Sequence, residues 1–506
     1  MKIEKTILAL AMLLCPWGLS LTVAQSTDQQ SLALLQQELA EQKQQIRALQ
    51  EQLNAEQGPW GLFEEKAKTE TAASAGDPSD ANGNLRVRFP LGAEEPYQLA
   101  GDGSDNVKGF QIQNYFVDYD KGFVIRPYDA KKHPFELRIG GWIQFRHHAF
   151  SRDSDSWTDN AGVTRPIYNR SAFDVERGRL VFSGFALDKR LTYFLQMDGD
   201  TDGLHTVDFF DYFWGWQLTD RFQVQVGKRK VPGSRQWLLT ARRTRFSDRP
   251  MANDFFRPDR TVGVFGVGDF GANGHYQLMW GNGFQTTNLA NSLTDTLMTF
   301  AASSYVDPWG DFGSNLVDFE GCSDPLVRLG HSFAYSPQKS NTLGSPLDET
   351  SFVRLADGTR LTQTGALAPG VTVSQYDLVF YGLDASYKGY GWSVNSEVFC
   401  RWINDIQGDG PLADDSLQQF GYYVEGGYFL IPKVFDLNLR HSQVNGDYGS
   451  ASEFAIGCNW FPLKKQQMKV SFEVTQLDGS PLQNTSTDIL VGDNGALFRT
   501  QVQLEF

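Results

Sequence analysis

Long apolar runs are missing from the sequence beyond its N-terminal region. A helix that crosses a bilayer needs about 18 or more consecutive apolar residues, and no later segment supplies them. The mean hydropathy of -0.37 agrees with this observation. The sequence therefore argues against a protein that crosses a membrane with helices.

Cysteine is also scarce, with four residues in a chain of 506. Cys15 lies in an expected leader, which leaves Cys322, Cys400 and Cys458. An odd number rules out a complete disulfide framework in a secreted protein. Cys400 and Cys458 alternate in phase with neighbouring apolar residues, so we expect them to behave as small apolar side chains.

Positive charge is in deficit, since the formal net charge is -15. Such a balance argues against a nucleic-acid-binding protein. The patterns that mark nucleophilic hydrolases, zinc peptidases, P-loops and dinucleotide sites are missing as well. We therefore expect no enzymatic activity, no cofactor and no nucleic-acid partner.

Two stretches imitate metal sites. DGDTDG, which begins at Asp198, resembles the start of a calcium loop, but Phe209 stands where a bidentate glutamate is needed. His147 and His148 are neighbours in an expected strand, so they face opposite sides and cannot share an ion. The sequence therefore predicts no metal site.

Three segments precede the main domain. Residues 1–24 are typical of a cleaved secretory signal peptide, with Lys2 and Lys5 before an apolar run and small residues before position 25. Residues 25–57 are expected to form a coiled-coil helix, and residues 58–106 a flexible linker. The apolar seam of the helix repeats every 3.5 residues and has one polar position: Leu32, Leu35, Leu39, Gln42, Ile46, Leu49 and Leu53. This period favours an oligomer, a trimer over a dimer, although a single helix lying on its own domain is the alternative.

Residues 107–506 form the main domain, and from Phe135 onward they alternate apolar and polar side chains, the pattern of strands with two different faces. In the last nine residues, FRTQVQLEF, one face carries Phe498, Leu504 and Phe506 and the other Arg499, Gln501 and Gln503. The same period runs through FELRIGGWIQF, LTYFLQMDGD and RFQVQVGKR. One pattern persists over about 370 residues without a linker, which is unlike a series of sandwich domains. We therefore expect an all-β chain folded as a transmembrane antiparallel β-barrel, with apolar side chains facing outer-membrane lipid.

The length of this region sets the size of the barrel. At about 23 residues per strand and connection it holds about 16 strands, enough for an aqueous lumen. Short turns at 430–433 and 461–465 contrast with long polar excursions at 282–330 and 339–372, an asymmetry typical of outer-membrane barrels. Aromatic residues near expected turns fit interfacial girdles: Phe210, Tyr212, Trp214, Trp216, Trp402, Trp460 and Phe461.

One stretch, residues 228–260, reverses the charge of the chain. Its ten basic residues face only three acidic ones, Asp248, Asp254 and Asp259. The basic residues are Lys228, Arg229, Lys230, Arg235, Arg242, Arg243, Arg245, Arg249, Arg257 and Arg260. We interpret the stretch as a loop folded into the pore, whose basic side chains coordinate anions. The alternatives are charge pairing with carboxylates of the lumen, or contact with lipopolysaccharide if the loop lies outside.

Several stretches of the barrel region carry a family resemblance: FELRIGGWIQF, FDVERGRLVFSG, VQVGKRKVP, FFRPDRTVGV, YYVEGGYFL and CNWFPLKKQQMKV. In this order they resemble the phosphate-selective porin O and P family of outer-membrane channels. The family pattern Gly-x-x-Lys-x-Pro-Phe-Gly falls on Gly227, Lys230 and Pro232, with its Phe-Gly step shortened to Gly233, and the family arginine before Val-Gly-Val falls on Arg260. The resemblance implies a trimer of barrels of about sixteen strands, each with a basic constriction.

The sequence thus leads to two functional hypotheses. The first is an outer-membrane porin, a homotrimer, that passes small inorganic anions, phosphate among them, by passive diffusion through an Arg/Lys-lined constriction. The alternative is a structural outer-membrane protein. Its coiled coil would tether the envelope through contact with cell-wall material, and its barrel would serve as an anchor.

Overall fold

The computed structural model describes residues 111–506, except 113, 121, 202–206, 285–296 and 341–352. The predicted signal peptide (1–24), coiled coil (25–57) and linker (58–106) lie outside the described residues. In the part of the chain that is described, no helix is both long and apolar enough to span a membrane.

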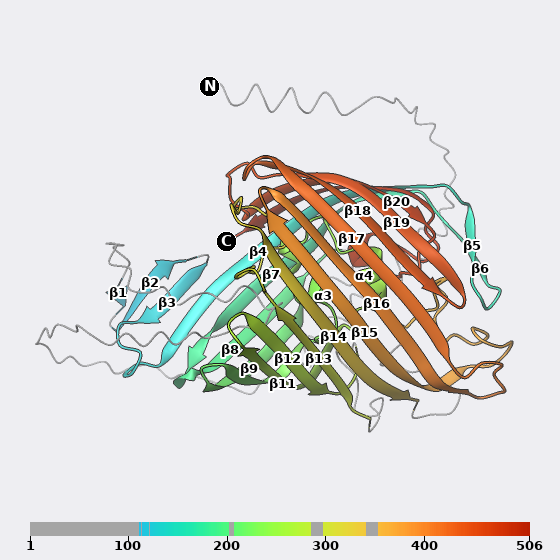
Figure 1. Cartoon of the computed structure of the whole chain (residues 1–506), viewed down its shortest axis with the longest axis horizontal. Helices are drawn as coiled ribbons and strands as arrows, with labels where there is room; N and C mark the ends of the chain where they lie inside the picture. The colour runs from blue at the N-terminus through green and yellow to red at the C-terminus, as the bar shows by residue number, and fades with distance from the viewer. Residues whose placement is uncertain (1–110, 113, 121, 202–206, 285–296, 341–352) are drawn as a thin grey trace, which may run out of the picture. The chain divides into compact units, whose positions relative to one another are not determined.

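Within the described residues, 16 antiparallel strands form a closed barrel (Figure 1). The ring closes because the last strand, β21, pairs with the first, β4, from Gly495 opposite Arg152 to Glu505 opposite Trp142. The barrel strands are β4 (Phe135–Arg152), β7 (Arg170–Ala186), β8 (Asp188–Gly199), β9 (Val207–Thr219), β10 (Phe222–Lys230), β11 (Arg260–Phe270), β12 (Gly274–Gly281), β13 (Thr299–Val306), β14 (Leu326–Lys339), β15 (Val373–Gly389), β16 (Trp392–Gly408), β17 (Leu417–Ile431), β18 (Phe435–Gly446), β19 (Gly449–Trp460), β20 (Met468–Asp478) and β21 (Gly495–Glu505). This confirms the prediction of an all-β barrel of about 16 strands.

Five short strands lie outside this ring. β1 (Gln111–Ile112), β2 (Tyr115–Tyr119) and β3 (Phe123–Pro127) precede the barrel, and β3 pairs with the first residues of β4. β5 (Ser156–Thr158) and β6 (Thr164–Pro166) form a separate hairpin in the connection between β4 and β7.

The strands turn their charged side chains inward and their apolar side chains outward. Arg146 on β4 and Arg499 on β21 are 0% and 2% exposed, whereas their neighbours Phe145 and Phe498 are 46% and 47% exposed. Leu504 and Phe506 are likewise exposed, and Gln501 and Gln503 are buried. The alternation that the sequence predicted at the C-terminus is therefore confirmed.

Three connections fold into the barrel. The first, residues 231–259 between β10 and β11, is called the inner loop and contains α3 (Arg235–Leu238), η1 (Ala241–Arg243) and α4 (Met251–Phe256). The others are loop 353–372, which leads into β15, and loop 479–494 between β20 and β21, which contains η2 (Thr485–Thr487). Met251, Leu355 and Leu482, one from each connection, share a buried apolar cluster with strand residues.

Two expectations about the connections are wrong. The described part of 339–372 is no polar excursion, because its apolar side chains, such as Leu355 and Leu361, are buried in that cluster. Segment 282–330 is no single excursion either, because β13 divides it, and the part after β13 connects two antiparallel strands, β13 and β14. Residues 307–325 therefore lie at the end of the short turns, where Phe319 packs on Phe429 and Phe461.

Four of the seven aromatic residues predicted for the girdle are exposed on the outside of the barrel. Tyr212, Trp214, Trp216 and Trp460 are exposed on the outer face. Phe210 is turned inward at a bulge, since Phe209 pairs with Met197 whereas Asp211 pairs with Gln196. Phe461 lies beyond the end of β19 and is buried. A one-residue irregularity and a turn therefore change the phase that the sequence pattern predicted.

Candidate functional site

The inner loop crosses the lumen and is held on the opposite wall by carboxylates. Glu397 on β16 accepts hydrogen bonds from Ser234 Oγ at 2.9 Å and from the backbone N–H groups of Arg235 and Gln236 at 3.0 and 2.7 Å. Glu473 on β20 accepts one from Ser247 N at 2.7 Å, and Glu453 on β19 accepts one from Met251 N at 2.6 Å. The first N–H groups of a short helix or turn have no partner within it. Here carboxylates from the strands accept their hydrogen bonds.

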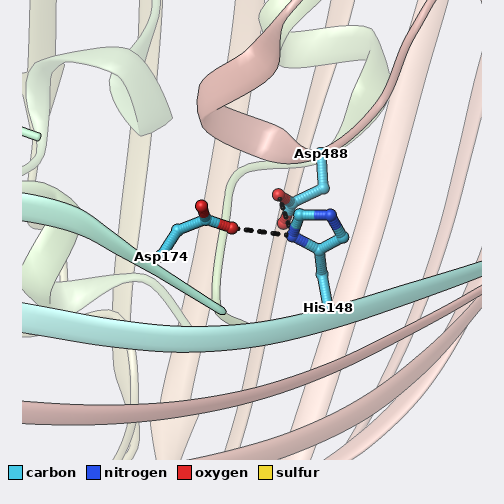
Figure 2. A group of neighbouring side chains, drawn as sticks. All are labelled: His148, Asp174 and Asp488. Atoms are coloured by element: carbon cyan, nitrogen blue, oxygen red, sulfur yellow. Dashed lines mark ion pairs between the residues drawn. The ribbon is translucent and has the colours of Figure 1, made fainter. Parts of the chain in front are cut away.

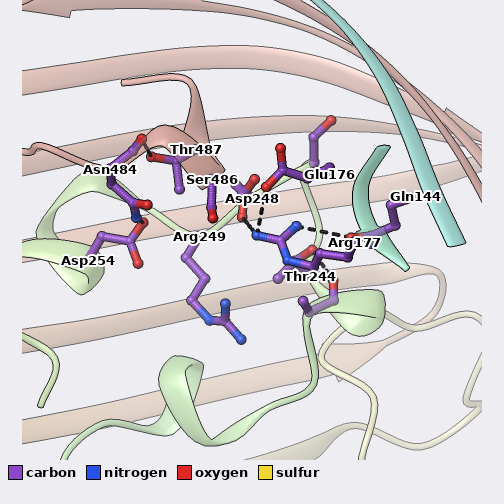
Figure 3. A network of polar contacts seen from close by, with 12 residues as sticks. Gln144, Glu176, Arg177, Thr244, Asp248, Arg249, Asp254, Asn484, Ser486 and Thr487 are labelled. Carbon is purple, nitrogen blue, oxygen red and sulfur yellow. Dashed lines mark hydrogen bonds and ion pairs between the residues drawn. The ribbon is translucent and has the colours of Figure 1, made fainter. Parts of the chain in front are cut away.

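Ion pairs attach the middle of the inner loop to β4 and β7. The carboxylate of Asp248 lies 2.5 Å from Arg146 Nη2 and 2.9 Å from Arg177 Nη2. Figure 3 shows Arg177 between Asp248 and Glu176, with Gln144 on its other side. Arg440 on β18 donates to the backbone oxygen of Asp248 at 2.7 Å. The loop is therefore fixed on both sides of the lumen.

A cavity of about 390 Å³ lies between the inner loop, the wall from β7 to β11, and loops 353–372 and 479–494. Eight basic and six acidic side chains line it, so its lining carries an excess of positive charge. The basic residues are Arg177, Arg179, Lys230, Arg249, Arg257, Arg260, Arg354 and Arg360. The sign of this lining favours anions over cations.

Trp237 on α3 lies at the centre of the positive charge. Four cationic groups lie over or beside its indole ring, within cation–π range. Their distances to the ring centroid are 4.9 Å for Lys230 Nζ, 4.9 Å for Arg249 Cζ, 3.9 Å for Arg257 Cζ and 5.0 Å for Arg260 Cζ. These five residues are called the Trp237 cluster.

Only two of the four cations in this cluster have carboxylate partners. Arg260 lies 2.9 Å from Asp211, and Arg257 lies 2.7 Å from Asp254. Among the described residues, Lys230 and Arg249 have no carboxylate within ion-pair distance and donate to backbone carbonyl oxygens instead. Figure 3 shows the guanidinium group of Arg249 pointing away from the carboxylates of Asp248 and Asp254.

Arg249 is almost completely buried, at 7% exposure. Burial, together with the charge of Arg257, lowers the pKa of Arg249 to about 9. The group still carries its charge at neutral pH, because a guanidinium group holds its proton strongly. A buried cation without a counter-charge is stabilised when an anion enters its surroundings.

The other six basic residues of the predicted stretch do not line this cavity. Lys228 and Arg229 belong to β10; Lys228 donates to the backbone oxygen of Phe209, and Arg229 donates to Gln225 and Gln277. Arg235 pairs with Asp384 at 3.3 Å. These three therefore serve the packing of the wall and of the inner loop.

Arg242, Arg243 and Arg245 lie on another side of the inner loop. Arg242 and Arg243 pair with Glu505 near the C-terminus at 2.6 and 2.9 Å. Arg245 donates to Asn438 and Ser393. All three line a second hollow of about 20 Å³ together with Lys469. The structure thus divides the ten predicted residues into separate groups.

Sequence reasoning missed half of the basic residues that line the larger cavity. Arg177 and Arg179 are two positions apart in FDVERGRLVFSG, so they share the inner face of β7, and this spacing could have identified them. Arg354 and Arg360 come from loop 353–372 and carry no such signal. Neither of these two pairs with a carboxylate among the described residues.

Comparison with known proteins identifies a family. The sequence model of the family described as phosphate-selective porin O and P matches residues 154–506. No curated protein sequence matches the chain.

Three solved structures are similar in outline. The anion-selective porin from Comamonas acidovorans is 11% identical, with a TM-score of 0.48, over 73% of this chain and 99% of that one. The outer membrane channel DcaP of Acinetobacter baumannii is 10% identical, with a TM-score of 0.45, over 73% and 97%. OmpT of Vibrio cholerae, in its trimer form, is 12% identical, with a TM-score of 0.44, over 73% and 99%.

At these identities and TM-scores the structural likeness carries no argument about function. The family match covers more than half of the chain and all but the first of the barrel strands. The chain therefore belongs to the phosphate-selective porin O and P family, and is an outer-membrane porin rather than an enzyme.

Proposed function

We propose that this porin passes small inorganic anions, phosphate among them, and that the Trp237 cluster is its anion-selective constriction. Passage is passive and involves no covalent step. Selectivity arises because a partly dehydrated anion meets fixed cations in the cavity, whereas a cation is repelled. Arg354 and Arg360, which line the same cavity from loop 353–372, are proposed to attract anions toward the cluster.

One observation carries this proposal. Lys230 and Arg249 both line the cavity, and both are bound only to carbonyl oxygens of the inner loop. A carbonyl dipole compensates a full positive charge only in part, so a passing anion supplies the missing counter-charge. It does so without displacing a carboxylate, which keeps the exit barrier low, as conduction requires.

The test is the reversal potential of the purified protein in planar bilayers under a salt gradient. We expect preference for anions, reduced several-fold by Arg249→Gln because one uncompensated cation leaves the cavity. Arg229→Gln is the matched control, since Arg229 is equally buried and lacks a carboxylate partner but does not line the cavity. Adding inorganic phosphate on one side should reduce the chloride current. Cation preference in the unmodified protein contradicts the proposal.

The N-terminal segments complete the proposal. We propose that residues 1–24 are removed on secretion and that residues 25–57 hold three barrels together as a homotrimer through their heptad seam. Deleting residues 25–57 should then abolish the trimer on native gels while anion conductance survives. If envelope attachment is lost instead and the oligomer is unchanged, the tether hypothesis is favoured.

A further inference from the structure

Three side chains that can bind a metal ion converge on the inner wall. They are His148 on β4, Asp174 on β7 and Asp488, which follows η2 in loop 479–494 (Figure 2). His148 Nδ1 lies 3.1 Å from Asp174 Oδ2 and 2.8 Å from Asp488 Oδ1. The candidate ligand atoms of all three residues lie within 4.8 Å of one another.

A single imidazole nitrogen does not satisfy this arrangement well. Nδ1 carries at most one hydrogen, which can be directed at only one of the two carboxylate oxygens. Neither oxygen lies where a hydrogen on Nδ1 would form a well-directed bond. Without that hydrogen, a nitrogen lone pair and two carboxylates would repel one another. A cation between the three atoms removes both difficulties.

The groups around Asp488 hold it in position. Arg146 Nη1 lies 2.9 Å from Oδ2 of Asp488, which leaves Oδ1 directed at His148. Arg170 donates to the backbone oxygen of Asp488 at 2.7 Å and supports a left-handed backbone there, with φ of 58°. The carboxylate is therefore held in one orientation, as metal ligands with supporting partners are.

The local charge also favours a divalent cation. The connected network holds four carboxylates, Asp174, Glu176, Asp248 and Asp488, and two guanidinium groups, Arg146 and Arg177. Neighbouring pairs such as Arg499 with Glu473 and Arg170 with Asp493 are balanced within themselves. The network therefore carries an excess of negative charge, which a divalent ion offsets.

We propose that His148 Nδ1, Asp174 Oδ2 and Asp488 Oδ1 bind one divalent transition-metal ion of the Zn²⁺ type, with water completing the coordination. A nitrogen ligand beside two carboxylates suits zinc and its neighbours better than magnesium or calcium, which prefer oxygen alone. The ion joins loop 479–494 to the barrel wall. Because residues 481–484, 486 and 487 of this loop line the channel cavity, the bound ion fixes one side of the permeation path.

The site was hidden in the sequence. His148 and Asp174 lie close together on neighbouring strands, since His148 is opposite Ala172, two positions before Asp174 on β7. Asp488, however, is more than 300 positions away from both in the sequence. His147, the neighbouring residue, faces outward and contacts Ser171. The two histidines cannot share an ion because they face opposite sides of the strand. This argument does not exclude an ion held by His148 and distant carboxylates.

The test is Zn²⁺ binding to the purified full-length protein in detergent. Binding is measured by calorimetry and by metal analysis after dialysis. We expect one ion per chain, and affinity weakened about 100-fold or more by either His148→Gln or Asp174→Asn. His147→Gln is the matched control and should bind as the unmodified protein does. A heat-modifiable shift on gels identifies variants that retain the barrel, and two different ligand variants guard against the failure of one to fold.

Each result decides the matter. Stoichiometric Zn²⁺ binding that depends on His148 and Asp174 but not on His147 supports the site. Equal binding by the unmodified protein and by folded His148→Gln overturns it. Because metal binding is measured without ion flow, its outcome is independent of the proposed anion selectivity.

Discussion

Lys230 and Arg249 donate hydrogen bonds to the same acceptor, the backbone oxygen of Leu239, at 2.8 and 2.9 Å. One comes from the end of β10 and the other from the inner loop, 19 positions later in the chain. The side-chain donors of both residues therefore meet at one oxygen beside Trp237, and among the described residues no carboxylate pairs with either. An anion that reaches this point is attracted by both at once.

The first prediction is that these two residues act together. Lys230→Gln and Arg249→Gln should each lower the anion-to-cation permeability ratio, because the proposed anion site needs both side chains together. The double variant should fall little further than the stronger single variant, since coupled neighbours give interaction energies of about 0.5–3 kcal/mol. Reversal potentials of the four proteins form the double-mutant cycle. Strictly additive losses would mean that the two cations bind ions separately.

The second prediction concerns the attachment of the inner loop. Asp248→Asn removes the carboxylate that Arg146 and Arg177 share and leaves two buried guanidinium groups with fewer partners. We expect a loss of about 3 kcal/mol in the free energy of unfolding and a stronger anion preference. Denaturant midpoints in detergent and reversal potentials measure the two effects. Asp188→Asn, at an exposed pair with Arg190 at the start of β8, is the control and should change stability by less than about 0.5 kcal/mol.

The third prediction concerns the start of the inner loop. Glu397 accepts four hydrogen bonds, including one from Tyr423 at 2.9 Å, so Glu397→Gln turns an amide N–H₂ group toward donors. Each buried polar group left unpaired costs on the order of 1–3 kcal/mol. A lower unfolding midpoint and noisier single-channel currents should result. Glu320→Gln, at an exposed pair with Lys433, should show neither change.

Much of this architecture follows from local sequence. The period of two in FRTQVQLEF predicts which side chains of β21 face outward, because alternation depends only on the pleat. The excess of basic residues between 228 and 260 predicts the inner loop from composition alone. Phe210 departs from the predicted phase because one bulge, at Gln196 and Met197, depends on how β8 and β9 pair.

The sequence alone does not show which of the ten basic residues line the cavity. In the sequence, Arg242 and Arg243 cannot be distinguished from Arg249. In the structure, however, both pair with Glu505, more than 250 positions later. Arg249 keeps its uncompensated charge because the inner loop turns its side chain toward Leu239 and away from Asp248. Such pairings depend on closure of the whole barrel, and so does the meeting of His148 with Asp488.

The last prediction is a pH dependence that arises from one of two neighbouring aspartates in the cavity. Burial raises the pKa of Asp254 above its usual value, although Arg257 and Arg249 oppose the shift. Burial acts in the same direction on Asp248, but Arg177 and Arg146 outweigh it there and hold the pKa well below the usual range. As pH falls, Asp254 therefore takes up a proton before an ordinary aspartate would, whereas Asp248 stays ionised.

Protonation of Asp254 removes a negative charge beside Arg257, which lies 3.9 Å from the Trp237 ring centroid. The anion-to-cation permeability ratio should therefore rise as the pH is lowered through the raised pKa of this group. Asp254→Asn should reproduce the low-pH ratio at neutral pH and abolish the change between the two conditions. A variant that still responds to pH as the unmodified channel does would place the titrating group elsewhere in the lumen.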